Sequence, residues 1–175
     1  MSDSTVELKS CSPEYFLSAE NRRRTDAKVV EVFRMMFGFE IEPVGTPDEG
    51  ARTGDSDERT AVIGFSGALR GSCQVRMSTE AARSVASAML GGIPVEDDDS
   101  VDDALGEVCN MLAGGWKDGI PALSSNCSLS PPTVISGRDY KVHVHKPSWQ
   151  VSRTYRFEAY ALQMILCCED GAVND

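Results

Sequence analysis

The chain has 175 residues, a mass of 18.9 kDa and a formal net charge of −10, with 17 Lys and Arg against 27 Asp and Glu. This length fits one domain and buries roughly 70% of the unfolded surface, so the core needs no disulfide or metal. An acidic surface repels phosphate backbones, which argues against a nucleic-acid-binding protein. No segment reaches the ~20 apolar residues of a membrane span. The start of the chain lacks the apolar stretch of a signal peptide, so we expect a cytoplasmic protein.

The six cysteines show neither a C-x-x-C pair nor the spacing of zinc ligands. In a reducing compartment we expect free thiols that fill the core rather than a redox centre. These residues are Cys11, Cys73, Cys109, Cys127, Cys167 and Cys168.

The N-terminal residues 1–25 are polar, and we interpret them as an extension in which Ser12 and Pro13 are typical of a helix start. Apolar periodicity begins near Asp26 and ends at Gly38, which predicts a helix. We therefore expect one domain over residues 26–168 and a frayed tail over residues 169–175. Residues 45–58 are rich in Gly, Pro, Asp and Ser, which predicts a surface loop.

The middle of the chain predicts a β-hairpin followed by a helix. The segments TAVIGFSG (60–67) and GSCQVRMS (71–78) read as its two strands. Residues 79–90 follow as a helix that Ser78 or Thr79 caps and that ends at two glycines. An acidic run at 96–99 precedes a second helix, over residues 101–117, with Ser100 and Asp103 placed as in a capping box.

The last third of the chain predicts strands. Residues 133–146 alternate as one strand, and residues 149–167 are also typical of a strand. His143 and His145 lie on one face of the first of these, and with no third ligand in view we expect surface or dimer-edge residues rather than a metal site. The sequence has no G-x-S-x-G motif, P-loop or Rossmann glycine pattern, which argues against a hydrolase triad or a nucleotide site.

The helix over residues 101–117 separates into two faces at 100° per residue. Its polar stripe opposes the core and holds, one turn apart, a carboxylate at Glu107 and an amide at Asn110. Gly114 follows one turn later, although a glycine inside a helix costs about 1 kcal/mol relative to alanine. Close approach of another chain is one physical reason to keep it, and an ordinary solvated helix face is the alternative. The predicted core face is Val101, Ala104, Leu105, Val108, Leu112 and Trp116, and the predicted outer face is Asp103, Glu107, Asn110, Gly114 and Lys117.

This helix fits the E-x-x-N-x-x-x-G signature of the CheC/CheX/FliY chemotaxis phosphatases, through Glu107, Asn110 and Gly114. The segments at 64–92, 103–117 and 131–142 resemble the CheX type in particular, and MFGFEIEP (36–43) is similar to the end of that family's first helix. The likeness runs from about residue 26 to 145. It implies an α+β fold of the CheC type, a single domain with long helices packed on a mostly antiparallel sheet. It also implies a homodimer that joins sheets across an edge.

The same resemblance implies the activity, which is hydrolysis of the aspartyl phosphate of a CheY-like receiver domain in two-component signalling. Asn110 would hold the attacking water, and Glu107 would pair with the receiver's lysine. Asp103 and Gly114 would bind the partner. The enzyme would need no cofactor or metal of its own, with Mg²⁺ expected on the receiver. A non-catalytic receiver-binding or scaffold module of the same fold is the alternative hypothesis.

Overall fold

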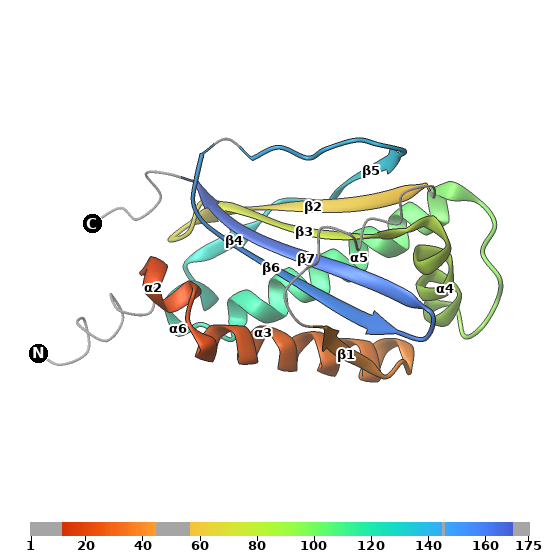
Figure 1. Cartoon of the computed structure of the whole chain (residues 1–175), viewed down its shortest axis with the longest axis horizontal. Helices are drawn as coiled ribbons and strands as arrows, with labels where there is room; N and C mark the ends of the chain where they lie inside the picture. The colour runs from red at the N-terminus through yellow and green to blue at the C-terminus, as the bar shows by residue number, and fades with distance from the viewer. Residues whose placement is uncertain (1–11, 45–56, 145, 170–175) are drawn as a thin grey trace, which may run out of the picture.

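The computed structural model describes residues 12–44, 57–144 and 146–169. An antiparallel seven-stranded sheet runs in the order β1-β6-β7-β3-β2-β4, and β5 pairs with β2 beside β4. The helices α3, α4 and α5 pack on one face of this sheet, which confirms the expected α+β class (Figure 1). The strands are β1 Ile41–Val44, β2 Glu58–Gly67, β3 Gly71–Ser78, β4 Cys127–Leu129, β5 Thr133–Gly137, β6 Pro147–Phe157 and β7 Tyr160–Glu169. The helices are α2 Pro13–Phe16, α3 Ala19–Val32, the π-helical η1 Phe33–Phe37, α4 Thr79–Met89, α5 Asp98–Asp118 and α6 Pro121–Ser124.

The predicted hairpin is the centre of the sheet. β2 and β3 pair along their whole length, and alternate residues of β3 (Cys73, Val75, Met77) are buried beneath the helices. Gly71 opens β3 where β7 comes very close, because a Cβ there would lie 2.0 Å from the carbonyl oxygen of Cys167. The following helix α4 starts as predicted, with Ser78 as its N-cap. Hydrophobic alternation and a small residue therefore fix this part of the sheet.

The N-terminal extension differs from the prediction. α3 begins at Ala19, so the boundary expected at residue 26 falls inside a helix. The predicted start at Ser12 and Pro13 is confirmed by α2, whose Phe16 is fully buried and stacks on Trp149 at 4.4 Å. The apolar pattern does not predict the first turns of α3, because the polar residues Asn21 and Thr25 occupy its buried positions there. Residues 1–11, with Cys11, lie outside the described residues.

The long helix α5 starts one turn earlier than predicted. Its N-cap is Asp97, whose carboxylate accepts a hydrogen bond of 2.8 Å from the backbone N–H of Ser100. This hydrogen bond lowers the pKa of the Asp97 carboxyl. The capping box expected at Ser100 and Asp103 is therefore wrong, because the acidic run itself supplies the cap and enters the helix.

The C-terminal strands also differ from the prediction. The strand expected over residues 133–146 ends at Gly137, where φ is +152°, and the Tyr140 hydroxyl turns back to contact Thr60 at 2.7 Å. The strand expected over residues 149–167 is a hairpin, β6 and β7, with Glu158 in its turn at a φ of +49°. Without glycine or asparagine in this turn, the sequence gives no strong hairpin signal. The predicted tail overlaps β7 at Glu169, and residues 170–175 lie outside the described part, as do residues 45–56 of the predicted loop.

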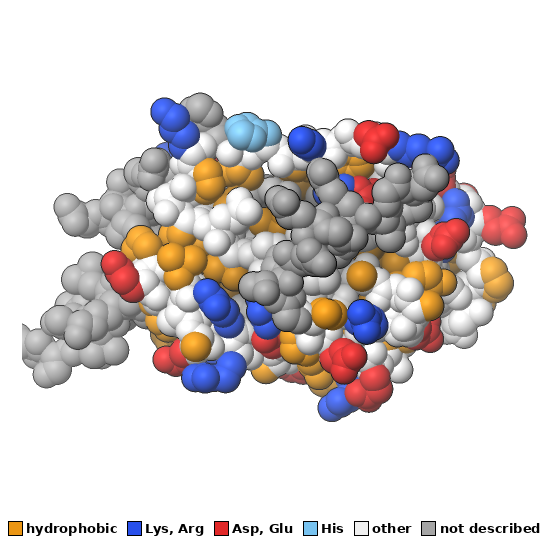
Figure 2. Space-filling view, in the orientation of Figure 1, with side chains coloured by type: hydrophobic (Ala, Val, Ile, Leu, Met, Phe, Trp, Pro, Cys, Tyr) orange, Lys and Arg blue, Asp and Glu red, His pale blue; other side chains and the backbone are white. Residues whose placement is uncertain are grey.

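The five described cysteines are free and buried, as predicted: Cys73, Cys109, Cys127, Cys167 and Cys168. Within the described ranges no helix is long and apolar enough to cross a membrane. Figure 2 views the sheet face opposite α5, where basic and acidic side chains are interspersed with hydrophobic ones.

A polar cluster joins α3 to β6. The Asp26 carboxylate accepts hydrogen bonds from Arg153 Nη2 at 2.6 Å, Arg153 Nε at 3.0 Å and the Tyr155 hydroxyl at 2.8 Å. Burial raises the pKa of Tyr155, and the adjacent carboxylate of Asp26 raises it further. The Asp26 hydrogen bond also raises the pKa of Arg153. The three side chains satisfy one another in a largely buried setting, where an unpaired partner is costly.

We expect the Asp26→Ala variant to lose about 2–4 kcal/mol of unfolding free energy, because Arg153 and Tyr155 would be left without their acceptor. Urea denaturation followed by circular dichroism measures the loss. The control is Glu31→Ala on the same helix, which removes an exposed ion pair with Lys28 and should cost under about 1 kcal/mol. Equal losses for the two variants would contradict this account.

Candidate functional site

The core face of α5 is as predicted. All six of its residues are buried, and they pack on the sheet: Val101, Ala104, Leu105, Val108, Leu112 and Trp116. Two residues at the borders of this face, Cys109 and Met111, are fully buried and partly buried respectively. Contacts with β2 and β3 beneath and with α3 and α4 alongside hold the helix in one orientation. The opposite face is therefore fixed in space as well.

The polar stripe points away from the core. The side chains of Asp103, Glu107 and Asn110 are exposed. Within the part of the chain that the structure describes, the side chains of Glu107 and Asn110 form no hydrogen bond or ion pair. A carboxylate and an amide lie one turn apart with all their hydrogen-bonding capacity directed outward. The geometry thus offers two polar groups to a partner.

The outer face is shorter than predicted because Lys117 does not belong to it. Lys117 is buried, donates a hydrogen bond to the Ser124 carbonyl oxygen and pairs with Asp118 at 2.7 Å. The short helix α6 folds back over the end of α5 and covers this side chain. The angular position of Lys117 on an isolated helix could not predict that α6 buries its side chain.

The three glycines of α5 have different neighbours. A Cβ on Gly115 would lie 2.7 Å from Cδ of Lys28, and one on Gly106 would lie 3.1 Å from Cγ of Pro132. These two glycines let α3 and the chain before β5 pack closely on α5. A Cβ on Gly114 would meet only Leu129, at 3.8 Å, which is an ordinary contact. The protein's own packing therefore does not require glycine at position 114.

The connection between β4 and β5 borders the stripe, a contact that the helical spacing of α5 does not predict. Leu129 and Pro132 approach α5 at Gly114 and Gly106. Ser130 holds the connection on the sheet, where its hydroxyl accepts a 2.9 Å hydrogen bond from the backbone N–H of Gly64. Pro131 and Pro132 are exposed. The paired prolines, which restrict the backbone, are the only sequence signal for this fixed border.

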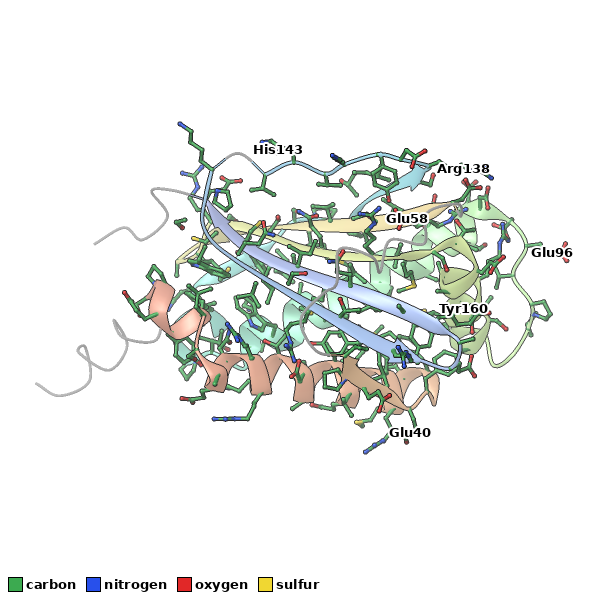
Figure 3. The ribbon with its side chains drawn as sticks, in the orientation of Figure 1. Glu40, Glu58, Glu96, Arg138, His143 and Tyr160 are labelled. Carbon is green, nitrogen blue, oxygen red and sulfur yellow. The ribbon has the colours of Figure 1, made fainter. Side chains whose placement is uncertain are left out.

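Other candidate chemistry lies elsewhere. A cavity of about 230 Å³ between α3 and the end of α5 is lined by residues such as Lys28, Gly115 and Trp116, but not by the stripe. His143 is exposed on the segment after β5, far from the start of α5 near Glu96 (Figure 3). His145 lies outside the described residues. Among the described residues no group of three or more His, Cys, Asp or Glu is placed to hold a metal ion.

Comparison with known proteins relates this helix and sheet to one family. The family model described as chemotaxis phosphatase CheX matches residues 59–154, which include the hairpin and α5. The chain is 35% identical over 115 residues to the CheY-P phosphatase CheX of Thermotoga maritima, covering 65% of this chain and 74% of that protein.

Solved structures share the fold. CheX of Vibrio vulnificus superposes with a TM-score of 0.70 at 24% identity, covering 86% of this chain and 97% of that one. CheX of Borrelia burgdorferi, solved in complex with CheY, BeF3 and Mg²⁺, gives a TM-score of 0.65 at 18% identity and covers 86% and 98%. The family match spans more than half of the chain, and the fold agrees over most of the rest. The chain therefore belongs to the chemotaxis phosphatase CheX family.

Proposed function

We propose that this protein is a phosphatase that hydrolyses the aspartyl phosphate of a CheY-like receiver domain. The observation that carries the proposal is the pair formed by Glu107 and Asn110, exposed one turn apart on α5 and free of partners among the described residues. The name of the Thermotoga relative supports the reaction, and the Borrelia complex supports a CheY-type partner.

Asn110 orients the attacking water in this proposal. Its side-chain amide donates to a phosphoryl oxygen and accepts from the water, which places the water oxygen in line with the bond that breaks. The water oxygen bonds to phosphorus and the bond from phosphorus to the aspartyl oxygen breaks, so the aspartate leaves as a carboxylate. The two protons of the water remain on the inorganic phosphate or pass to solvent. A carboxylate at this position would repel the phosphoryl oxygens. Phosphoryl transfer needs mainly positioning and charge stabilisation, which an amide provides.

Glu107 docks the receiver in this proposal. Its carboxylate pairs with the lysine of the receiver's active site, while Asp103 and Gly114 extend the contact along the same stripe. The receiver supplies the phosphoryl group, the lysine and Mg²⁺, so this chain brings no cofactor. The Mg²⁺ in the Borrelia complex is consistent with this division.

We also propose that the protein is a homodimer. The resemblance implies joining of sheets across an edge, and β1 and β5 each pair with only one strand among the described residues. β1 covers only Thr154–Phe157 of β6, so the rest of that edge has no partner strand among the described residues and could pair with a second copy.

The function and the role of Asn110 are tested together by adding the protein to a Mg²⁺-phosphorylated receiver and following the loss of phosphate. We expect the wild type to accelerate the loss and Asn110→Ala to reduce kcat by about 10²–10³-fold, since the water loses its orienting group. The control Gln150→Ala removes an exposed amide from β6 and should match the wild type. An Asn110→Ala variant that still binds the receiver and still accelerates the loss would rule out this role. Binding by the wild type without acceleration would instead favour the non-catalytic module.

Glu107→Ala should weaken binding of the receiver by about 1–3 kcal/mol, and Glu107→Lys should weaken it further by placing two cations together. Titration against a receiver held in its phosphorylated form by beryllium fluoride and Mg²⁺ measures the affinity without turnover. Glu20→Lys, a charge reversal at an exposed site on α3, serves as the control for net charge. Unchanged affinity in both Glu107 variants would contradict the ion pair.

Gly114→Ala should raise the unfolding free energy by up to about 1 kcal/mol, because alanine favours the helix and the protein's own atoms leave space for the methyl group. The same methyl group should raise KM for the phosphorylated receiver at least ~5-fold by blocking its close approach. Urea denaturation and steady-state kinetics measure the two effects. A variant that is more stable and has an unchanged KM would show that the receiver does not contact Gly114.

A further inference from the structure

We propose that Arg59 is a positioning residue for this phosphatase, and that it refines the rotation and the axial position that the apolar core gives to α5 on the sheet. The inference rests on the proposed function, because it concerns how Glu107 and Asn110 are held for that reaction. Arg59 lies on β2, outside the polar stripe, and its role comes from its contacts with the first two turns of α5.

Arg59 carries a full charge under the helices. Its side chain is only 5% exposed, on the same face of β2 as the buried residues Ala61 and Ile63. Burying a guanidinium is costly unless each N–H finds an acceptor. A buried arginine in a sheet strand is therefore held in place by a specific set of partners, and these partners show what it orients.

The partners of Arg59 lie mainly on α5. Its Nη2 contacts the Asp98 carboxylate at 2.6 Å, and its Nη1 contacts the Asp102 carboxylate and the Asp98 carbonyl oxygen, the latter at 3.4 Å. Its Nε donates to Thr79 Oγ1 at 3.3 Å, at the start of α4. All three guanidinium nitrogens are used, and two of them hold the start of α5. The planar fork gives these contacts a direction as well as a charge.

The two carboxylates differ in their dependence on Arg59. Asp98 also pairs with Arg83 Nη2 at 2.8 Å, so it keeps one cation if Arg59 is removed. Among the described residues the Asp102 side chain pairs with Arg59 alone, and it is 32% exposed. Loss of Arg59 should therefore affect Asp102 more than Asp98. Asp102 immediately precedes Asp103, the first residue of the polar stripe.

The contact with Asp98 and Asp102 fixes the direction of the stripe. The two carboxylates are one turn apart on α5 and both reach Arg59 on β2, while the Asp98 side chain is 67% exposed and the Asp102 side chain 32% exposed. From Asp102, a rotation of 100° per residue places Asn110 roughly 80° around the helix axis and Glu107 roughly 140° around it. A helix held at Asp98 and Asp102 therefore keeps both polar groups at fixed angles to Arg59.

The apolar core fixes which face of α5 meets the sheet, and small adjustments within that packing remain. Small packed residues such as Ala104 and Ala113 provide few projections that resist a small shift of the helix. Hydrophobic contacts are also non-directional. A shift of 1 Å suffices to disturb in-line attack and to cost about 10²-fold in rate. Arg59 supplies the directional contact that packing of small residues lacks. Glu58, its neighbour on β2, lies toward the same end of the molecule as Glu96, which precedes α5 (Figure 3).

The experiment compares Arg59→Met, Arg59→Lys and Asp102→Asn with the wild type in steady-state hydrolysis of the phosphorylated receiver. We expect Arg59→Met to lower kcat about 10–100-fold with KM changed less than ~3-fold, because docking of the helix tolerates a shift that in-line attack does not. Arg59→Lys keeps the charge without the fork and should recover part of kcat. Asp102→Asn should lower kcat in the same direction as Arg59→Met.

A matched control and a second measurement distinguish positioning of α5 by Arg59 from a general contribution of Arg59 to stability. Arg153→Met breaks the corresponding arginine contact between α3 and β6, so it should lower stability and leave kcat within ~2-fold. Hydrogen exchange of backbone amides should quicken over residues 99–106 in Arg59→Met and not in Arg153→Met. If Arg59→Met does not fold, Arg59→Lys and Asp102→Asn decide the question.

Two outcomes would overturn the inference. Folded Arg59 and Asp102 variants with wild-type kcat would show that the contact does not position the reaction, and the proposed function would stand. Unchanged exchange in α5 would show that Arg59 does not hold the helix, whatever the activity. A wild-type protein that leaves the receiver's phosphate untouched would instead contradict the proposed function, while the exchange experiment would still report on the helix.

Discussion

The burial of one face of α5 against β2 and β3 is the constraint on which the rest of the structure depends. The apolar residues of this face are buried, so the helix cannot turn far without breaking the core. Everything opposite that face is therefore presented to solvent at a fixed angle. Close contacts of Gly106 with Pro132 and of Gly115 with Lys28 further restrict the position of α5. The fold converts a hydrophobic pattern into an accurately placed pair of polar side chains.

This arrangement suits chemistry that is divided between two proteins. Glu107 and Asn110 have no described partner within the chain, so their hydrogen-bonding capacity is kept for another molecule. The acyl phosphate that the proposal assigns to the receiver is already reactive, and the assisting protein needs to contribute only orientation. A rigid helix meets this requirement better than a loop, because its backbone does not have to be ordered when the partner arrives.

Local patterns predicted the elements whose signals are strong. The β2–β3 hairpin, α4 with its Ser78 cap and the two faces of α5 follow from alternation, capping and the helical period. Errors arose where tertiary contacts replace a local signal. α3 begins with a polar segment because Asn21 is buried beneath α2, where it donates a hydrogen bond to the Phe16 carbonyl oxygen. The β6–β7 turn has no glycine to signal it, because Glu158 takes the position with positive φ. The long pairing of β6 with β7 holds the residue in this conformation.

The sequence by itself determined the candidate pair, since the spacing of Glu107 and Asn110 and the apolar positions around them place both on one helix face. It also determined the family resemblance, through motifs in a fixed order. Only the tertiary structure decided that Lys117 is covered, that Gly115 packs on Lys28 while Gly114 has space, and that Arg59 reaches Asp98 and Asp102. The physical reason is that each of these contacts joins two different elements of the fold. Periodicity reports how neighbouring residues within one element share a surface, whereas contacts between elements exist only once the sheet and helices have packed.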